Sequence, residues 1–288
     1  MNRLKAYSAV ENSLSAGAAP SISLVIAVYN KPEVLRCALA ACARQSVEGF
    51  EVIVADDGSA PAIAEVVREA KESYHFPITH LWHEDRGWRK NIMLNNAIRA
   101  SKSDYLVFID GDCIAARDFL KDHLDEREPH RLLLGRRVEM SERWAEALNV
   151  EKIASGRFER IGLFDVIDGV RGKAARLEDG IRIKNTLIRK LIKRDSDKIL
   201  GSNFSVHKSD LVAVNGFDEA YDGPGHGEDS DIQYRLSLVG VTGKSLRNLA
   251  IQFHVFHTRT MPSDRSVKRF EEVRKSGDPR CKLGLEKL

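Results

Sequence analysis

The sequence has no apolar run long enough to cross a lipid bilayer. Its longest continuous apolar stretches, such as Leu24–Tyr29, fall far short of the roughly 20 residues that a transmembrane helix requires. Residues 1–20 begin with basic side chains but contain no continuous apolar segment, so we expect no secretory signal there.

Cysteine pairs and excess charge are also missing. The four cysteines form no CxxC pair and no regular framework, which is typical of reduced thiols in a cytoplasmic protein. The 45 Lys and Arg residues nearly balance the 42 Asp and Glu residues. We therefore expect no nucleic-acid partner, and any electrostatic ligand has to be sought at local clusters of charge.

The chain does contain enough apolar sequence for one large core, because 43% of its 288 residues are hydrophobic. We expect a single domain over residues 21–259, preceded by an extension at 1–20. The sequence from Met261 onward is polar, basic and weakly periodic, so residues 260–288 are expected to form a loose basic tail.

Strand and helix patterns alternate over the first half of the chain. Continuous apolar runs of strand length are separated by segments with helical periodicity. This alternation predicts an α/β fold, with a mostly parallel sheet and flanking helices in a Rossmann-like arrangement. The predicted strands are Ile22–Tyr29, Glu51–Ala55, Ile78–Trp82, Asp104–Ile109 and, after a less regular segment from Ser141 to Lys198, Leu249–Phe256; the predicted helices include Pro32–Ser46, Ala62–Lys71, Trp88–Ala100 and Glu228–Val239.

Polar side chains follow three of the predicted strands, at the edge where parallel sheets bind ligands. They are Tyr29 at the end of the first strand, Asp57 after the second, and Asp110 with Asp112 after the fourth. A simple turn is one interpretation of the Asp-Gly-Asp sequence, since both residue types favour turns. The buried strand that leads into it favours a divalent cation site instead, with Gly111 allowing close approach of a ligand.

Two further charged clusters each begin a predicted helix. Arg89 and Lys90 form either a solvated turn or a site for a diphosphate, and cations at a helix start mildly favour an anionic partner. Glu228 and Asp229 complement the dipole of their helix. The glycine-rich loop Gly223–Gly227 that precedes them suggests a ligand as well, and a carboxylate there could take a proton from an attacking hydroxyl group.

His254 and His257 lie at the end of the last predicted strand. Strand alternation would point their side chains to opposite faces, so we expect only one of them to bind a metal ion. His257 is the better candidate because it stands at the strand end and neutral imidazole is a common metal ligand. Otherwise a lone strand histidine is a core or surface residue.

Taken in order, these motifs resemble the large inverting family of nucleotide-diphospho-sugar glycosyltransferases with the glycosyltransferase A fold. LVIAVYN, ADDGS and FIDGDC are similar to its donor-nucleotide half, which would cover residues 21–115. GSNFSVHKSDLVAVNGFDE and GHGEDSDIQYRL are similar to the acceptor half of its galactosyl- and N-acetylgalactosaminyltransferase branch, which would cover residues 116–259. The loop GPGHG departs from that branch because it lacks a tryptophan.

The resemblance implies a role for each candidate residue. Asp57 would bind uracil or ribose, and Asp229 would be the general base. The metal ligands would be Asp110 and Asp112, as the DxD acids, together with His257. Arg89 and Lys90 would compete for the phosphate role. The substrate-binding set would be Ala27, Tyr29, Asp57, Arg89, Lys90, Asp110, Gly111 and Glu228.

We therefore predict an enzyme that moves a sugar from a UDP-sugar to an acceptor hydroxyl group with inversion, in bacterial surface polysaccharide or glycolipid synthesis. Mixed oxygen and imidazole ligands suit Mn²⁺ slightly better than Mg²⁺. One alternative is a sugar-phosphate nucleotidyltransferase, although the Gly-rich basic loop expected after its first strand is absent. Another is a non-catalytic module that binds glycan or membrane.

Residues 182–194 contain six basic side chains and no acid, with apolar residues at helical spacing. The segment is either a packed surface helix with a solvated charged face or a helix that lies on an anionic membrane. The second interpretation would suit an acceptor carried on a lipid, and would place a cytoplasmic enzyme peripherally on the inner face of the membrane.

Overall fold

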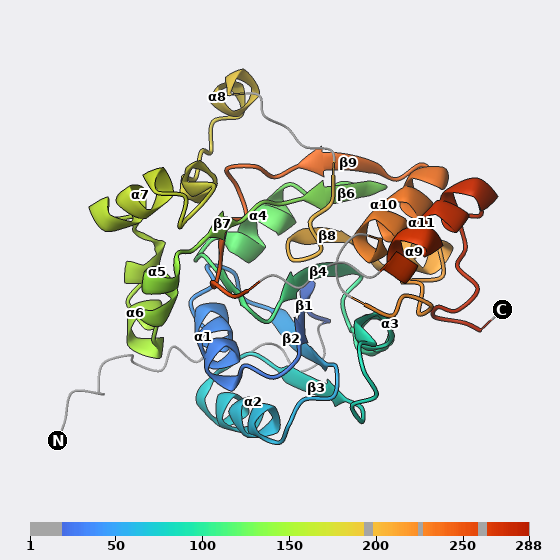
Figure 1. Ribbon diagram of the computed structural model, residues 1–288, viewed down its shortest axis with the longest axis horizontal. Coiled ribbons are helices and arrows are strands. Elements are labelled where there is room, and N and C mark those ends of the chain that lie inside the picture. The colour runs from blue at the N-terminus through green and yellow to red at the C-terminus, as the bar shows by residue number, and fades with distance from the viewer. Residues whose placement is uncertain (1–18, 193–197, 224–226, 259–263, 288) are drawn as a thin grey trace.

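Two β-sheets form the centre of the protein (Figure 1). The computed structural model describes residues 19–192, 198–223, 227–258 and 264–287. The larger sheet has the order β3-β2-β1-β4-β8-β6-β9 and the smaller one β5-β10-β7. The strands are β1 (Ile22–Val28), β2 (Phe50–Asp56), β3 (Ile78–Trp82), β4 (Tyr105–Asp110), β5 (Cys113–Ala115), β6 (Arg131–Leu134), β7 (Val138–Glu139), β8 (Phe204–His207), β9 (Thr242–Ser245) and β10 (Gln252–His254).

The larger sheet is mostly parallel, as the sequence predicts. Every residue of β1 and β2 is buried, which is the pattern of strands covered on both faces. β1 pairs in parallel with β2 and β4, β2 with β3, and β6 with β9. Only β8 reverses direction within the described part of this sheet, pairing antiparallel with β4 and β6. The predicted single-domain α/β fold is therefore confirmed.

Helices cover both faces of the larger sheet. Apolar residues of α1, α2 and α4 share one core with one face, and those of α3, α9 and α10 share a second core with the other. The helices are α1 (Pro32–Cys42), α2 (Ala62–Ser73), α3 (Lys90–Ala100), α4 (Phe119–Asp125), α5 (Glu142–Glu146), α6 (Val150–Ala154), α7 (Leu163–Val170), α8 (Thr186–Leu191), α9 (Lys208–Ala213), α10 (Glu228–Leu238) and α11 (Asp264–Ser276), with 3-10 turns η1 (Arg157–Glu159) and η2 (Leu177–Gly180).

The C-terminal region is folded, so the expectation of a loose tail is wrong for the described residues 264–287. α11 packs against α10, where the rings of Tyr234 and Phe270 meet edge to face with centroids 6.4 Å apart. Arg269 Nη2 lies 2.7 Å from a carboxylate oxygen of buried Asp218, and Cys281 is buried beyond the helix. The apolar pattern of the sequence did not predict this helix because α11 is mostly polar, with only Ser266 and Val273 of its residues buried.

The helix predicted over residues 182–194 is much shorter in the structure. α8 covers only residues 186–191, and residues 193 and 194 lie outside the described ranges. Arg182 instead forms ion pairs with Asp118 and Asp122 of the main body. Among the described helices, none combines the length and the apolar character needed to pass through a bilayer.

Candidate functional site

A cavity of about 970 Å³ opens at the carboxyl ends of β1, β2 and β4. Arg89 is the one predicted site residue that does not line it. Its guanidinium group donates to the carbonyl oxygen of Glu84, so of the two candidate cations only Lys90 reaches the cavity wall. The predicted residues that do line it are Ala27, Tyr29, Asp57, Lys90, Asp110, Gly111, Asp112, Glu228, Asp229 and His257.

The wall near β2 and β3 combines a buried carboxylate with aromatic side chains. Asp57 contacts His83 Nε2 at 2.8 Å and accepts a 2.9 Å hydrogen bond from the backbone N–H of Arg89. Burial raises the pKa of Asp57 above its usual range. Tyr29 donates to Asp85 at 2.9 Å, and both Tyr29 and Trp88 face the cavity. This wall therefore offers ring faces beside a hydrogen-bond acceptor.

The turn after β1 brings an unexpected cation to the cavity. Asn30 and Lys31 both have left-handed backbone conformations, with φ of 55° and 58°, which are uncommon for residues other than glycine. This turn places Lys31 Nζ 3.1 Å from Asp112 Oδ2. Gly111 is close-packed from the other side, since a Cβ atom there would lie 3.1 Å from the carbonyl oxygen of Ala27. A side chain at Gly111 would crowd the turn that carries Asp112.

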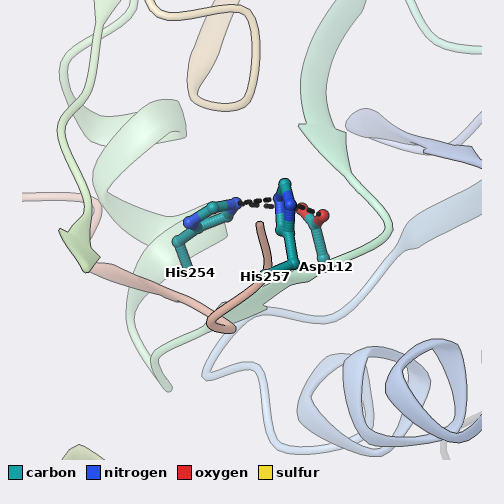
Figure 2. A group of neighbouring side chains, drawn as sticks. All are labelled: Asp112, His254 and His257. Atoms are coloured by element: carbon teal, nitrogen blue, oxygen red, sulfur yellow. Dashed lines mark hydrogen bonds and ion pairs between the residues drawn. The ribbon is translucent and has the colours of Figure 1, made fainter. Parts of the chain in front are cut away.

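Asp112, His254 and His257 converge in a group suited to a divalent metal ion, as Figure 2 shows. Asp112 lies 3.2 Å from His257 Nε2 and 3.5 Å from His254 Nε2, and the two Nε2 atoms are 3.2 Å apart. The possible ligand atoms all lie within 4.8 Å of one another. One carboxylate and two imidazole groups are a mixed oxygen and nitrogen donor set of the kind that binds divalent metal ions.

The expectation that the two histidines point to opposite faces is wrong. β10 ends at His254, so the alternation of a strand does not extend to His257. The chain turns there, and the two rings meet with centroids 4.9 Å apart. Asp110, predicted as a second carboxylate ligand, lies outside this group, and its carboxylate accepts a 2.7 Å hydrogen bond from Lys90.

Glu139, which the sequence analysis missed, orients His254. Its Oε2 atom lies 2.7 Å from His254 Nδ1. Because a carboxylate accepts a hydrogen bond, this contact favours the tautomer with the proton on Nδ1, in which Nε2 can bind a metal ion. Burial alone would raise the pKa of Glu139, but His254 and Arg137 lower it to about 2, so the carboxylate is ionised. β7, which carries Glu139, is only two residues long and leaves no periodic pattern in the sequence.

Two more carboxyl groups lie at the start of α10. Asp229 accepts a 3.0 Å hydrogen bond from the backbone N–H of Gly201, where a Cβ atom would overlap the Asp229 carboxyl group. Burial raises the pKa of Asp229, and burial together with Asp229 raises the pKa of Glu228 to about 8. Burial opposes the charge of Lys90, but Asp110, Asp229 and Glu228 hold its pKa above the ordinary value.

Known proteins resemble this chain over most of its length. The family described as Glycosyl transferase family 2 matches residues 23–174, and the family described as N-terminal domain of galactosyltransferase matches residues 184–258. Chondroitin synthase from Escherichia coli is 27% identical over 247 residues, covering 81% of this chain and 34% of the relative. Validoxylamine A glucosyltransferase from Streptomyces hygroscopicus subsp. jinggangensis is 29% identical over 231 residues, covering 77% and 52%.

Solved structures confirm the predicted glycosyltransferase A-like fold. A fragment of S. aureus TarS in complex with UDP aligns with a TM-score of 0.58 and 15% identity, covering 92% of this chain and 67% of that one. Mannosyltransferase PcManGT from Pyrobaculum calidifontis, in complex with GDP-Man and Mn²⁺, aligns with a TM-score of 0.55 and 16% identity, covering 84% and 59%. The chain spans about a third to a half of the length of the two curated relatives.

Proposed function

The chain belongs to glycosyl transferase family 2, and on this basis we propose that it transfers a sugar from a UDP-sugar to an acceptor hydroxyl group, with inversion at the anomeric carbon. One observation carries the proposal: the Asp112–His254–His257 group and the Asp229 carboxylate line the same cavity. A cation site and a proton acceptor are the two components that a one-step displacement from a diphosphate requires.

The nucleotide would lie at the ends of β1 and β2. Asp57 would accept hydrogen bonds from uracil or ribose, and the exposed ring of Tyr29 would cover one face of the base, next to the backbone of Ala27. Support for a nucleotide here comes from the glycosyltransferase A-like fold, in which ligands bind at the carboxyl ends of parallel strands. The fragment of TarS with the same fold was solved with UDP.

Asp112, His254 and His257 would hold a divalent metal ion, with Mn²⁺ favoured over Mg²⁺ by the two imidazole groups. When bound, the ion would neutralise charge on the departing diphosphate as a Lewis acid. Glu139 would keep His254 in the tautomer that presents Nε2. We assign Asp110, paired with Lys90, to the donor sugar and its phosphates rather than to the metal ion.

Asp229 would act as the general base. It would take the proton from the acceptor hydroxyl group as that oxygen bonds to the anomeric carbon, while the bond from this carbon to the UDP oxygen breaks and its electrons pass to UDP. The raised pKa of Asp229 makes it a stronger proton acceptor than an exposed aspartate. Glu228, beside it, would contact a hydroxyl group of donor or acceptor.

We also propose a glycan or lipid-linked acceptor, in bacterial surface polysaccharide or glycolipid synthesis at the inner face of the membrane. The names of two relatives, chondroitin synthase and poly-beta-1,6-N-acetyl-D-glucosamine synthase, support a polysaccharide product. The exposed Leu187 and Leu191 of α8 support membrane contact by residues 182–194. Arg182 and Arg189 of that segment are already paired with acids of the protein.

The test is a screen of UDP-sugars, with and without Mn²⁺, for UDP release and for protection against thermal unfolding. The proposal expects at least one UDP-sugar to protect the protein and to yield UDP only when the metal ion is present. A nucleotidyltransferase would instead consume UTP and a sugar phosphate, and a non-catalytic module would release no UDP. Either result would overturn the proposal.

A further inference from the structure

α7 exposes its apolar side chains and buries its acids. Leu163, Phe164 and Val170 are 72%, 69% and 86% exposed, whereas Asp165 and Asp168 are only 8% and 7% exposed. A surface helix of a globular protein normally has the reverse arrangement. Large apolar side chains exposed together in this way mark a surface that meets another partner.

The buried acids are held by specific contacts, so the orientation of α7 is fixed. Arg143 of α5 donates to Asp165 at 2.8 Å and to Asp168 at 3.0 Å. Ser141 also donates to Asp168 at 2.6 Å, and Asp165 accepts a 2.9 Å hydrogen bond from the backbone N–H of Gly162 at the helix start. Rotating the helix to bury its apolar side would break the contacts with Arg143 and Ser141.

A basic loop follows α7 directly. Arg171, Lys173 and Arg176 are exposed, and no acid occurs between Val170 and Leu177. The loop folds back onto the helix, because the backbone N–H groups of residues 173 and 174 both donate to the carbonyl oxygen at position 168. Exposed apolar side chains beside cations are the combination that an anionic lipid surface binds, since the first enter the acyl boundary and the second meet the headgroups.

The same loop is tied to the candidate metal centre. Ala175 and Glu139 exchange two backbone hydrogen bonds of 3.0 Å, and Glu139 orients His254. Arg176 lines the cavity itself. In Figure 1, α7 and α8 both project beyond the layers of the central sheet, towards the upper left. A surface docked through α7 would therefore lie close to the cavity mouth.

We propose that α7 and the Arg171–Arg176 loop form a docking surface for an anionic membrane, with α8 as a secondary contact. The surface would hold the cavity mouth at the headgroup layer, where an acceptor carried on a lipid presents its sugar. Only the use of this surface to hold the cavity near a lipid-linked acceptor rests on the proposed function. The membrane binding itself does not, because binding to vesicles does not require sugar transfer.

The test is co-sedimentation of the full chain with phosphatidylcholine vesicles that contain phosphatidylglycerol, with pure phosphatidylcholine vesicles as the uncharged comparison. We expect the wild type to pellet with the anionic vesicles at low salt and to dissociate at high salt. The triple change Leu163→Ser, Phe164→Ser and Val170→Ser should lower the vesicle partition coefficient by about tenfold or more. Arg171→Glu with Lys173→Glu should cause a loss of about the same size.

The matched control is Val212→Ser with Leu238→Ser, which removes exposed apolar side chains from α9 and α10 and should bind vesicles as the wild type does. Protection of each variant against thermal unfolding by UDP and Mn²⁺ would show that its fold and donor site are intact. If the donor-site proposal is wrong, this protection fails while vesicle binding is unaffected. The inference would be overturned if the wild type stays in the supernatant at low salt, if the α7 variant binds vesicles as the wild type does, or if the control variant loses binding. A dimer in size-exclusion chromatography that the α7 variant dissociates would also overturn it, because a second copy would then cover the helix.

Discussion

Two groups of carboxyl side chains line the cavity in opposite electrostatic settings, and we call them the ligand end, with Asp112, and the base end, with Asp229 and Glu228. At the ligand end, Asp112 is half-buried and lies among two histidines and Lys31, and these neighbours hold its pKa well below the usual range. At the other end, Asp229 and Glu228 lie near one ammonium group, that of Lys90, and burial raises the pKa of both. Burial raises the pKa of all three carboxyl groups, and only at Asp112 do the neighbouring side chains outweigh it.

This contrast in pKa indicates which carboxyl group is suited to which chemical role. A carboxylate that stays ionised when buried is ready to bind a cation, whereas one whose pKa is raised accepts a proton more readily. Both ends use aspartate, so residue type alone does not separate a metal ligand from a base. Asp112 fits the first role and Asp229 the second.

Removing the ligand end should have the largest effect. Asp112→Ala, and separately His257→Ala, should abolish most sugar transfer, because each change removes one of the three converging atoms that we propose hold the metal ion. Transfer is measured as UDP release over a series of Mn²⁺ concentrations, and circular dichroism checks the fold. A variant that keeps near wild-type turnover at low Mn²⁺ would show that its residue is not a ligand.

Changing the base end should reduce turnover without removing the donor site. Asp229→Asn preserves size and the hydrogen bond from Gly201 but removes the proposed proton acceptor, so kcat should fall by a factor on the order of 10²–10⁴. UDP affinity, measured by calorimetry in the presence of Mn²⁺, should be retained. An equal loss of UDP affinity would mean that Asp229 is structural.

Weakening the contact that orients His254 should have an intermediate effect. Glu139→Gln removes the charge that orients His254, so Mn²⁺ affinity should fall by about 10–100-fold. Titration followed by the electron paramagnetic resonance signal of free Mn²⁺ measures this directly, without any turnover. Glu142→Gln, at an exposed position of α5, is the matched control and should bind Mn²⁺ as the wild type does. Unchanged affinity in Glu139→Gln would remove its positioning role.

The smallest effect concerns stability alone. The Glu228 pKa is raised from 4.5 to about 8, so between these values the native state holds a proton that the unfolded chain has released. Wild-type stability should therefore fall as pH rises through this window, relative to Glu228→Gln, and the difference should level off above about pH 8. Thermal unfolding without added metal measures this difference. A difference that does not change with pH would contradict the raised pKa.

The part of the cavity at the ends of β1, β2 and β4 is the part that the sequence predicts best. Strands buried on both faces give long apolar runs, so the ends of β1, β2 and β4 are recognisable. The parallel arrangement then brings Asp57 and Asp112 to one edge, and both line the cavity. In this part of the chain, the apolar strand pattern and the parallel sheet of the structure therefore agree.

The features that the sequence does not predict depend on where strands end, on local turns and on contacts between elements. The convergence of His254 and His257 requires that β10 stop at His254, which the apolar pattern does not reveal. Lys31 contacts Asp112 because of a left-handed turn at Asn30 and Lys31, and the sequence gives no sign of this turn because it contains no glycine. The reversed orientation of α7 is set by Arg143 on α5, so the helix cannot be oriented from its own sequence.

One measurement tests the central claim that the two ends have separate tasks: protection of Asp112→Ala and Asp229→Asn against thermal unfolding by UDP, titrated with Mn²⁺. We predict that Asp229→Asn retains the Mn²⁺-dependent protection of the wild type although its turnover is lost, whereas Asp112→Ala loses both. If the two variants lose protection to the same extent, or if Asp112→Ala keeps it, the separation of a metal-binding end from a base end is contradicted.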